Sequence, residues 1–167
     1  MVVLDASTLI LIAKAELLDP FLAGSKLGVA IPGEVEKECC GSKKTFDALM
    51  IQKAVDESRI EVVAVKNRRL VAKLRGDFSS GKGEAEAIEL ALNEKAQLLG
   101  IDDKNGINAC KLQGIAFTTA VGILIRSQER GLLESSDALA KLAMLAKYGR
   151  YKDSIIDDAR LKLEGRP

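Results

Sequence analysis

Two apolar runs of the sequence end in acidic residues. Residues 2–4 are followed by Asp5, and residues 97–101 are followed by Asp102 and Asp103. Ligands of open parallel sheets bind beyond the carboxyl ends of the strands. A charged residue that closes a buried strand is unfavourable unless it is paired or coordinated. We therefore expect Asp5 in a functional site, with one member of the aspartate pair, because successive residues diverge at a strand end.

Three glutamates join this set if their helices lie beside those strand ends. Glu38 lies on the helix predicted after the second strand, and Glu84 and Glu86 begin the helix that follows a loop rich in Gly and Ser. Acidic residues in the first turn of a helix are also favourable partners of the helix dipole. That simpler role fits Glu36, Glu84 and Glu86 about as well, so the spacing alone leaves both interpretations open.

Clustered carboxylates point to one kind of chemistry. They repel one another and resist ionisation, and a hard divalent cation bound through oxygen offsets that repulsion. Mg²⁺ keeps several waters, which leaves positions for a phosphate oxygen and for an attacking water of lowered pKa. The pattern therefore indicates hydrolysis of phosphodiester bonds with Mg²⁺ or Mn²⁺ as the cofactor.

The composition excludes several other mechanisms. The 167 residues contain no histidine, which removes Ser-His and Cys-His triads and zinc sites with His ligands. Cys39, Cys40 and Cys110 lack C-x-x-C spacing; we expect them reduced and partly buried, as in a cytoplasmic protein. The 25 Lys and Arg residues face 24 Asp and Glu residues, so net charge predicts no partner. We expect no signal peptide and no membrane helix, and no nucleotide cofactor, since the phosphate-binding glycine motifs are missing.

Strand-like and helix-like segments alternate along the chain. The predicted strands are 2–4, 28–31, 60–65, 97–101 and 115–118. The predicted helices are 7–15, 34–40, 43–58, 67–74, 84–93, 104–112, 120–130, 135–148 and 152–163. This alternation predicts an α/β fold with a central parallel sheet of about four to five strands and helices on both faces. The last segments are purely helical, so we expect a domain at 1–133 and a C-terminal helical extension at 134–167 packed on it.

Five short motifs, in order, resemble those of the PIN domain family. The resembling stretches are L-D-A-S-T-L-I at 4–10, I-P-G-E-V-E-K-E at 31–38, G-E-A-E-A-I-E-L-A at 83–91, L-G-I-D-D-K at 99–104, and G-I-L at 122–124 with G-L at 131–132. The third motif is similar to that of a prokaryotic, VapC-like group within the family. Together the motifs cover about residues 1–133.

The resemblance implies a three-layer Rossmann-like fold and a metal-dependent endoribonuclease, often the toxin of a toxin–antitoxin pair. The residues to which it gives catalytic or metal-binding roles are Asp5, Glu38, Glu84, Asp102 and Asp103. Asp103 is our choice for the catalytic member of the pair. Ser7 would hold a metal-bound water or orient Asp5, although it could simply cap the first helix. Glu86 could take the role that we give to Glu84.

The sequence departs from the family pattern in two places. Asn105 to Asn108 stand where an Arg often follows the two aspartates, and Thr118 to Val121 stand where Gly-Thr is usual. The acids survive both changes. The departures therefore concern the groups that position a substrate.

One segment carries a local excess of positive charge. Between residues 66 and 82 only Asp77 opposes the cations, which are Lys66, Arg68, Arg69, Lys73, Arg75 and Lys82. We expect this segment to hold an RNA backbone, although a solvated helix face explains it equally well. Phe78 is the nearest aromatic residue, so we expect base stacking to contribute little.

The sequence leaves two other functions and two kinds of partner open. A phosphatase that forms an aspartyl-phosphate would use Asp5, but Ser7 stands where D-x-D requires an acid. A PIN-like RNA- or protein-binding module without catalysis is the other alternative, and the intact acids argue against it. The apolar faces of the last two helices either pack on their own domain or form a groove for an antitoxin or a second copy. The family resemblance favours a homodimer.

Overall fold

The computed structural model describes residues 1–42 and 44–165, and within them five strands form one sheet. The strands are β1 (Val2–Leu4), β2 (Val29–Pro32), β3 (Glu61–Val63), β4 (Leu98–Gly100) and β5 (Phe117–Thr118). All four pairings are parallel, and the spatial order is β3-β2-β1-β4-β5. The predicted parallel α/β architecture is confirmed.

Ten helices connect and flank the strands in the described residues. They are α1 (Ala6–Lys14), α2 (Leu18–Gly24), α3 (Gly33–Cys39), α4 (Phe46–Asp56), α5 (Arg68–Phe78), α6 (Lys82–Asn93), α7 (Lys104–Gln113), α8 (Ala120–Glu129), α9 (Ser135–Tyr148) and α10 (Asp153–Leu163). Lys43, the first residue of the helix predicted at 43–58, and residues 166–167 of the predicted extension lie outside the described part of the chain.

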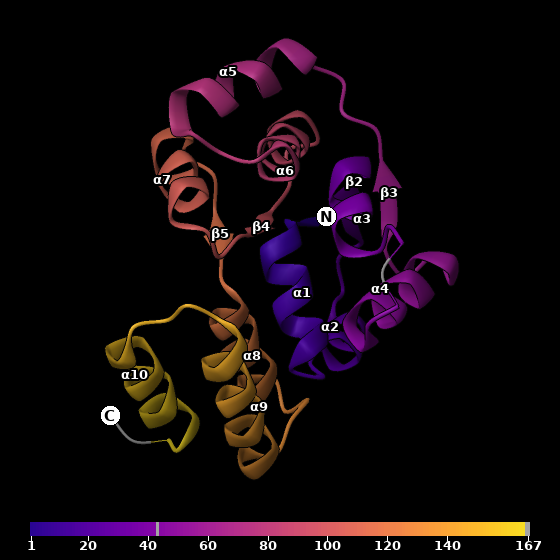
Figure 1. Ribbon diagram of the computed structural model, residues 1–167. Helices are drawn as coiled ribbons and strands as arrows, with labels where there is room; N and C mark the ends of the chain where they lie inside the picture. The colour runs from indigo at the N-terminus through magenta and orange to yellow at the C-terminus, as the bar shows by residue number, and fades with distance from the viewer. Residues whose placement is uncertain (43, 166–167) are drawn as a thin grey trace.

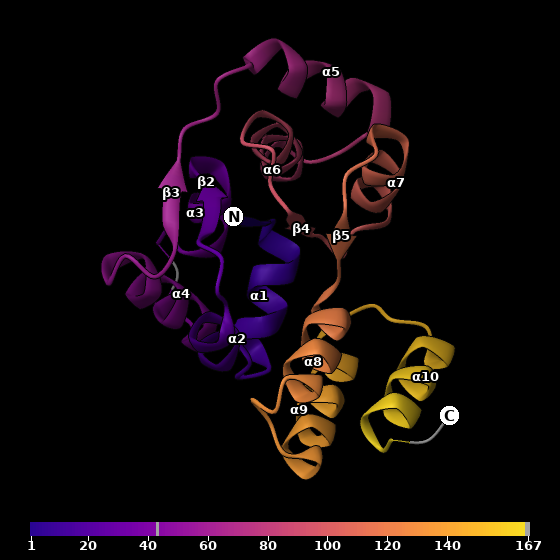
Figure 2. The same cartoon turned by 180° about the vertical axis from the view of Figure 1, so that it is seen from behind.

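The helices lie in two layers, one on each side of the sheet (Figures 1 and 2). Strands β2 and β3 follow on one side of β1 in the sheet, whereas β4 and β5 follow on its other side. Because such crossovers are right-handed, the two runs place their helices on opposite faces. Helices α1, α2, α4 and α8 pack together on one side, whereas α6 covers β1, β2 and β4 on the other and contacts α5 and α7.

The order of the strands reverses between β1 and β4. These neighbours pair with Leu4 opposite Gly100, and the next backbone N–H, that of Asp5, donates to the Gly100 carbonyl at 2.9 Å. Such a switch point leaves a crevice at the carboxyl ends of the strands, because the connecting segments leave in opposite directions. Asp5 and the chain from Ile101 onward therefore emerge at this crevice.

The apolar strands form the centre of the core. All residues of β1 and β2 are buried, as expected for strands covered by helices on both faces. Gly100 of β4 lacks a side chain where one would collide with Leu4 and Thr8. This glycine lets β4 and the start of α1 approach closely, which brings the two strand ends together.

The last two helices pack on the rest of the chain. Helix α9 contacts α1 and α8, and α10 contacts α8 and α9. Leu142, Leu145, Ile156 and Leu163 are buried, whereas Ile155 is 45% exposed. Most of the apolar surface of the predicted extension therefore packs within this chain.

Some segments differ from their predicted bounds. Helix α2 was not predicted, because it is short and Pro20 lies in its first turn, where proline is tolerated but breaks the apolar pattern. The predicted polar loop at 76–83 is only three residues long, since α5 continues to Phe78 and α6 begins at Lys82. Strand β3 is shorter than predicted, and half-exposed at its centre.

None of the helices in the described chain combines the length and the apolar character that crossing a lipid bilayer demands.

Candidate functional site

Asp5 is a buried carboxylate fixed at the start of α1. Its side chain accepts from the Thr8 N–H at 2.8 Å and from the Ser7 hydroxyl at 2.6 Å, so Asp5, not Ser7, caps the helix. Only 2% of the residue is exposed. Burial raises the pKa of Asp5 to about 7, with a smaller contribution from the charge of Asp102, although the two hydrogen bonds oppose the rise.

Glu84, in the first turn of α6, faces Asp5 and Asp103. Burial, followed by the charges of Asp103 and Asp5, raises the pKa of Glu84 to about 8. Its carboxyl lies within hydrogen-bonding distance of that of Asp103. Its Oε1 atom is buried and has no hydrogen-bond partner in the described chain. Partial burial and the neighbouring negative charges favour a proton or a cation at this carboxyl.

Asp102 joins four segments of the chain. Its Oδ2 accepts from the Thr8 hydroxyl at 2.7 Å and from the Ala120 N–H at 2.9 Å, and its Oδ1 accepts from the Tyr151 hydroxyl. The Asp102 N–H in turn donates to the Ser7 hydroxyl at 3.4 Å. Asp102 therefore ties α1, the end of β4, the start of α8 and the link between α9 and α10 together.

Asp103 points toward solvent and Glu84. It caps α7 by accepting from the Asn105 N–H at 2.8 Å, and it is exposed. The two aspartates thus diverge as expected at a strand end: Asp102 is held by neighbouring groups, whereas Asp103 remains at the surface of the crevice.

Tyr151 and Thr8 were not predicted to belong to the site. Burial, and then the charge of Asp102, raises the pKa of Tyr151 well above its usual range, so the hydroxyl remains a donor. Thr8 is fully buried, and the resemblance treated it as a variable position of its motif. No local pattern in the sequence points to Tyr151; its only distinguishing feature is that it is one of two tyrosines in the chain.

Glu38, near the end of α3, reaches the start of α6 with its side chain and contacts Gly83, the residue that precedes Glu84. Its Oε1 accepts from the Gly83 N–H at 3.1 Å, and Glu38 is exposed. A Cβ atom at Gly83 would collide with this carboxylate. The glycine of the third motif therefore makes room for Glu38, and through it α3 and α6 come together near the crevice.

The other two glutamates of α6 face away from Asp5. Glu86 is buried, and its Oε2 accepts from the Glu34 N–H at 3.3 Å in the first turn of α3. Glu89, to which we had given no role, is fully buried and accepts from the Asn67 N–H at 2.8 Å. Its other oxygen is buried and has no hydrogen-bond partner in the described residues. The structure therefore brings Glu84, not Glu86, to the acids.

A cleft of about 480 Å³ opens beside Asp102 and Asp103, which form part of its wall with Ser7. Tyr148, at the end of α9, and Arg150 also line it.

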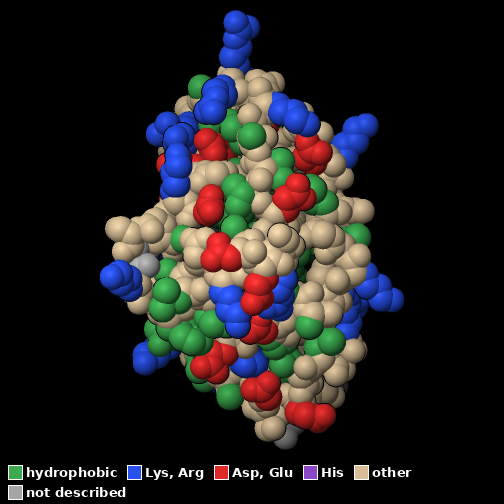
Figure 3. All heavy atoms as spheres, turned by 90° about the vertical axis from the view of Figure 1, so that its right-hand side faces the viewer, with side chains coloured by type: hydrophobic (Ala, Val, Ile, Leu, Met, Phe, Trp, Pro, Cys, Tyr) green, Lys and Arg blue, Asp and Glu red, His purple; other side chains and the backbone are tan. Residues whose placement is uncertain are grey.

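The basic segment predicted to bind RNA lies on α5 and the residues on either side of it. Figure 3 shows Lys and Arg side chains gathered at the top of the molecule, where α5 runs. Three of its cations already have acidic partners: Lys66 pairs with Glu94 at 2.7 Å, Lys73 pairs with Asp77, and Lys82 pairs with Glu34 at 2.8 Å. Arg68, Arg69 and Arg75 are exposed and form no ion pair with the described residues.

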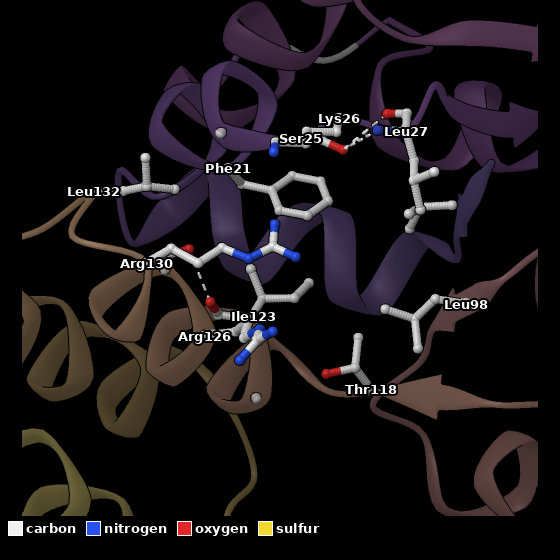
Figure 4. Close-up of a pocket in the computed structure, with 14 residues that line it drawn as sticks. Phe21, Ser25, Lys26, Leu27, Leu98, Thr118, Ile123, Arg126, Arg130 and Leu132 are labelled. Atoms are coloured by element: carbon white, nitrogen blue, oxygen red, sulfur yellow. Dashed lines mark hydrogen bonds between the residues drawn. The ribbon is translucent and has the colours of Figure 1, made fainter.

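A second pocket, of about 160 Å³, lies between α2 and α8 (Figure 4). Phe21, Ile123 and Leu132 form much of its apolar wall, and Arg126 and Arg130 extend along it. Of the residues that the structure describes, no carboxylate and none of the predicted site residues lines this pocket. It is therefore separate from the acidic crevice.

The acids suit a hard cation by their chemistry. The donors at the crevice are carboxylate oxygens, which Mg²⁺ and Mn²⁺ prefer. Among the described residues, no group of three or more His, Cys, Asp or Glu side chains is arranged so that it could hold a metal ion. Glu84 lies within hydrogen-bonding distance of Asp103, and the charge of Asp5 acts on it. The donor set and the unpartnered Glu84 oxygen fit a divalent ion.

Cys39, Cys40 and Cys110 are free thiols, and all three are buried. Burial, followed by the charges of Asp5 and Glu84, raises the pKa of Cys110 to about 11. Cys110 therefore stays a neutral thiol at physiological pH.

A family model described as a PIN domain matches residues 1–164. The chain therefore belongs to the PIN domain family, as its motifs predicted. PIN domains are generally nucleases, and they generally use divalent metal ions. The match continues through α9 and α10, beyond the motifs at 1–133. Searches of curated proteins and of solved structures returned no match.

Proposed function

We propose that this protein is an endoribonuclease that uses Mg²⁺ or Mn²⁺, held by Asp5, Glu84 and Asp103. The observation that carries the proposal is the Glu84 carboxyl. It is half-buried and lies within hydrogen-bonding distance of the Asp103 carboxyl, its buried Oε1 atom lacks a hydrogen-bond partner in the described chain, and its pKa is raised to about 8. The fold places these groups at the switch point of the sheet, where ligands of such folds bind.

The surrounding residues give each carboxylate a distinct task. Ser7 and the Thr8 N–H fix both oxygens of Asp5, which sets the direction in which its remaining lone pairs point. Asp102 is a positioning residue, because it holds the crevice walls together. Asp103 is exposed at the mouth and can contact solvent and substrate. A divalent ion bound here would supply a Lewis acid and a water of lowered pKa.

Cleavage assays with matched variants test this proposal. We expect the wild-type protein to cleave single-stranded RNA with Mg²⁺ or Mn²⁺ and not with EDTA. Glu84→Gln should lower the rate by at least about 100-fold, as expected for loss of a group that acts on the reacting water. Glu86→Gln, two residues along the same helix, is the control and should keep most activity. Equal rates for wild type and Glu84→Gln would refute the assignment.

The phosphatase alternative gains no support from the geometry. An aspartyl-phosphate mechanism centred on Asp5 gives no role to the Glu84 carboxyl, whose Oε1 atom lacks a hydrogen-bond partner in the described chain. An inactive binding module would leave that Glu84 oxygen unexplained as well. If the protein binds the metal but cleaves no RNA, the inactive binding module is the better explanation.

We also propose, from the family resemblance, that the protein acts in the cytoplasm as the toxin of a toxin–antitoxin pair and forms a homodimer. The three free cysteines agree with a reducing compartment. Growth arrest on expression of wild type but not Glu84→Gln would support the toxin role. Sedimentation equilibrium would measure the oligomeric state.

A further inference from the structure

The cleft beside Asp102 and Asp103 contains cations from parts of the chain that are distant in sequence. Lys14 ends α1, Lys104 begins α7, and Arg150 follows α9. Within the described residues, none of the three forms an ion pair. Three cations beside the acids would attract an anion that reaches the crevice.

Tyr148 adds an aromatic surface to the same wall. It is 46% exposed, and the ammonium groups of Lys14 and Lys147 lie 5.3 Å and 5.4 Å from its ring centroid. Stacking of a nucleic-acid base on an aromatic ring is generally stronger than an exposed cation–π contact. A base can therefore displace a lysine from the ring, and the displaced ammonium is then free to contact a phosphate.

The position of Tyr148 is fixed by the turn that follows it. The Gly149 N–H donates to the Leu145 carbonyl at 2.8 Å, and three residues after Tyr148 the Tyr151 hydroxyl donates to Asp102. A Cβ atom at Gly149 would collide with the Tyr151 ring and lie 2.9 Å from the Leu145 carbonyl oxygen. The turn is thus attached at one end to α9 and at the other to the acidic crevice.

We propose that this cleft seats a nucleotide of single-stranded RNA next to the bond that is cut, with a base stacked on Tyr148 and the adjoining phosphates held by Lys104 and Arg150. The inference rests on the proposed ribonuclease function and names its substrate-binding surface. The cleft volume of about 480 Å³ falls in the range of small-molecule sites, about 300–1,000 Å³. Single-stranded RNA fits because an unpaired base can turn out to stack, whereas a duplex keeps its bases inside.

Measurements of equilibrium RNA binding test this seat independently of the cleavage reaction. A fluorescently labelled, mixed-sequence 12-nucleotide RNA is titrated by anisotropy with Ca²⁺ in place of Mg²⁺. We expect Tyr148→Ala to weaken binding by roughly 10-fold, in line with the loss of one stacked base. Tyr148→Phe keeps the ring and should bind within about twofold of wild type. Arg150→Ala should weaken binding by several-fold, and Lys111→Ala, on the exposed side of α7, is the control for a lost surface charge.

A second arm uses the RNA itself. Oligonucleotides with one abasic position, moved along the strand, should reveal a position at which Tyr148→Ala no longer changes the affinity. Affinities of Tyr148→Ala and Arg150→Ala that match that of Lys111→Ala would overturn the proposed seat, even if the protein cleaves RNA. Conversely, binding that depends on Tyr148 and Arg150 without any metal-dependent cleavage would uphold the seat and refute the proposed function.

Discussion

Two basic regions of this molecule differ in how their charges are assembled. The region on α5 comes from one continuous stretch of sequence, and neighbouring acids neutralise Lys73 and Lys82. The cleft draws Lys14, Lys104 and Arg150 from three separate parts of the chain, and these have no ion pair among the described residues. A count of cations in a stretch of sequence therefore overestimates the positive charge that is free to bind a ligand, because folding brings acidic partners beside some of them.

The two regions also suit different tasks. Exposed arginines on a helix attract a polyanion over about a Debye length, roughly 8–10 Å in physiological salt. The cleft instead offers a ring, a fixed turn and cations beside the acids. We expect α5 to govern how strongly binding depends on salt, and the cleft to govern where the strand lies relative to the acids.

The largest effect that we expect is a pH dependence of the free energy of unfolding, which comes from the acids near the cleft and not from the cations of α5. Asp5 and Glu84 have pKa values raised to about 7 and about 8 in the folded protein, against ordinary values of 3.8 and 4.5. Between about pH 5 and pH 8 the folded state thus binds more protons than the unfolded state. The free energy of unfolding must therefore fall as the pH rises through this range, on the order of 2 kcal/mol or more.

Urea unfolding in EDTA at several pH values measures this dependence. Glu84→Gln should be more stable than wild type at pH 8 and should show a flatter pH profile, because its amide never ionises. Mg²⁺ should restore stability to wild type at pH 8. A wild-type protein whose metal-free stability rises from pH 5 to pH 8 would contradict the burial of these acids.

The Tyr151 hydroxyl provides the next largest expected effect. Tyr151→Phe removes the donor to Asp102 but keeps the ring, so the crevice walls lose one of their ties. Groups of this kind, behind the metal ligands, typically contribute 10–100-fold, and we expect kcat to fall by about 10-fold with KM little changed. Tyr148→Phe is the matched control and should leave kcat intact. A rise in KM alone would instead place Tyr151 in substrate binding.

The smallest effects should come from α5. Replacing Arg68 and Arg69 by Ala should lower affinity for RNA by several-fold and reduce the slope of log K against log salt by about 1.4, the value for two phosphate contacts on a single strand. Lys73→Ala should change the slope less, because Asp77 already pairs with that ammonium. An unchanged slope in the double variant would exclude α5 from RNA binding.

Much of the fold followed from local patterns. The apolar runs that end in Asp5 and Asp102 predicted parallel strands with acids at their carboxyl ends, because this pattern reports burial on both faces. The motif led us to propose Glu84 as a site residue, and the roughly 200° between residues two apart on a helix explains why Glu86 points to α3 instead. Helix α2 escaped prediction because it is short and contains a proline.

The remaining site residues depend on contacts between distant parts of the chain. Thr8 and Asp102 are 94 residues apart, and Tyr151 and Asp102 are 49 apart. No local periodicity reports such pairs. The low number of aromatic residues led us to expect little base stacking, whereas the structure places one of the two tyrosines on the wall of the cleft.

The hydrogen bond from Tyr151 to Asp102 also implies an order in which the parts of the site form during synthesis of the chain. A chain under synthesis exposes its acids first, and Tyr151 follows Asp102 by 49 residues. At about 5–20 residues per second, that interval is a few seconds. During it the nascent chain carries every proposed metal ligand but lacks the hydroxyl that fixes Asp102 and the turn that presents Tyr148. The acidic crevice therefore reaches its final form only after α9 has been made and has docked.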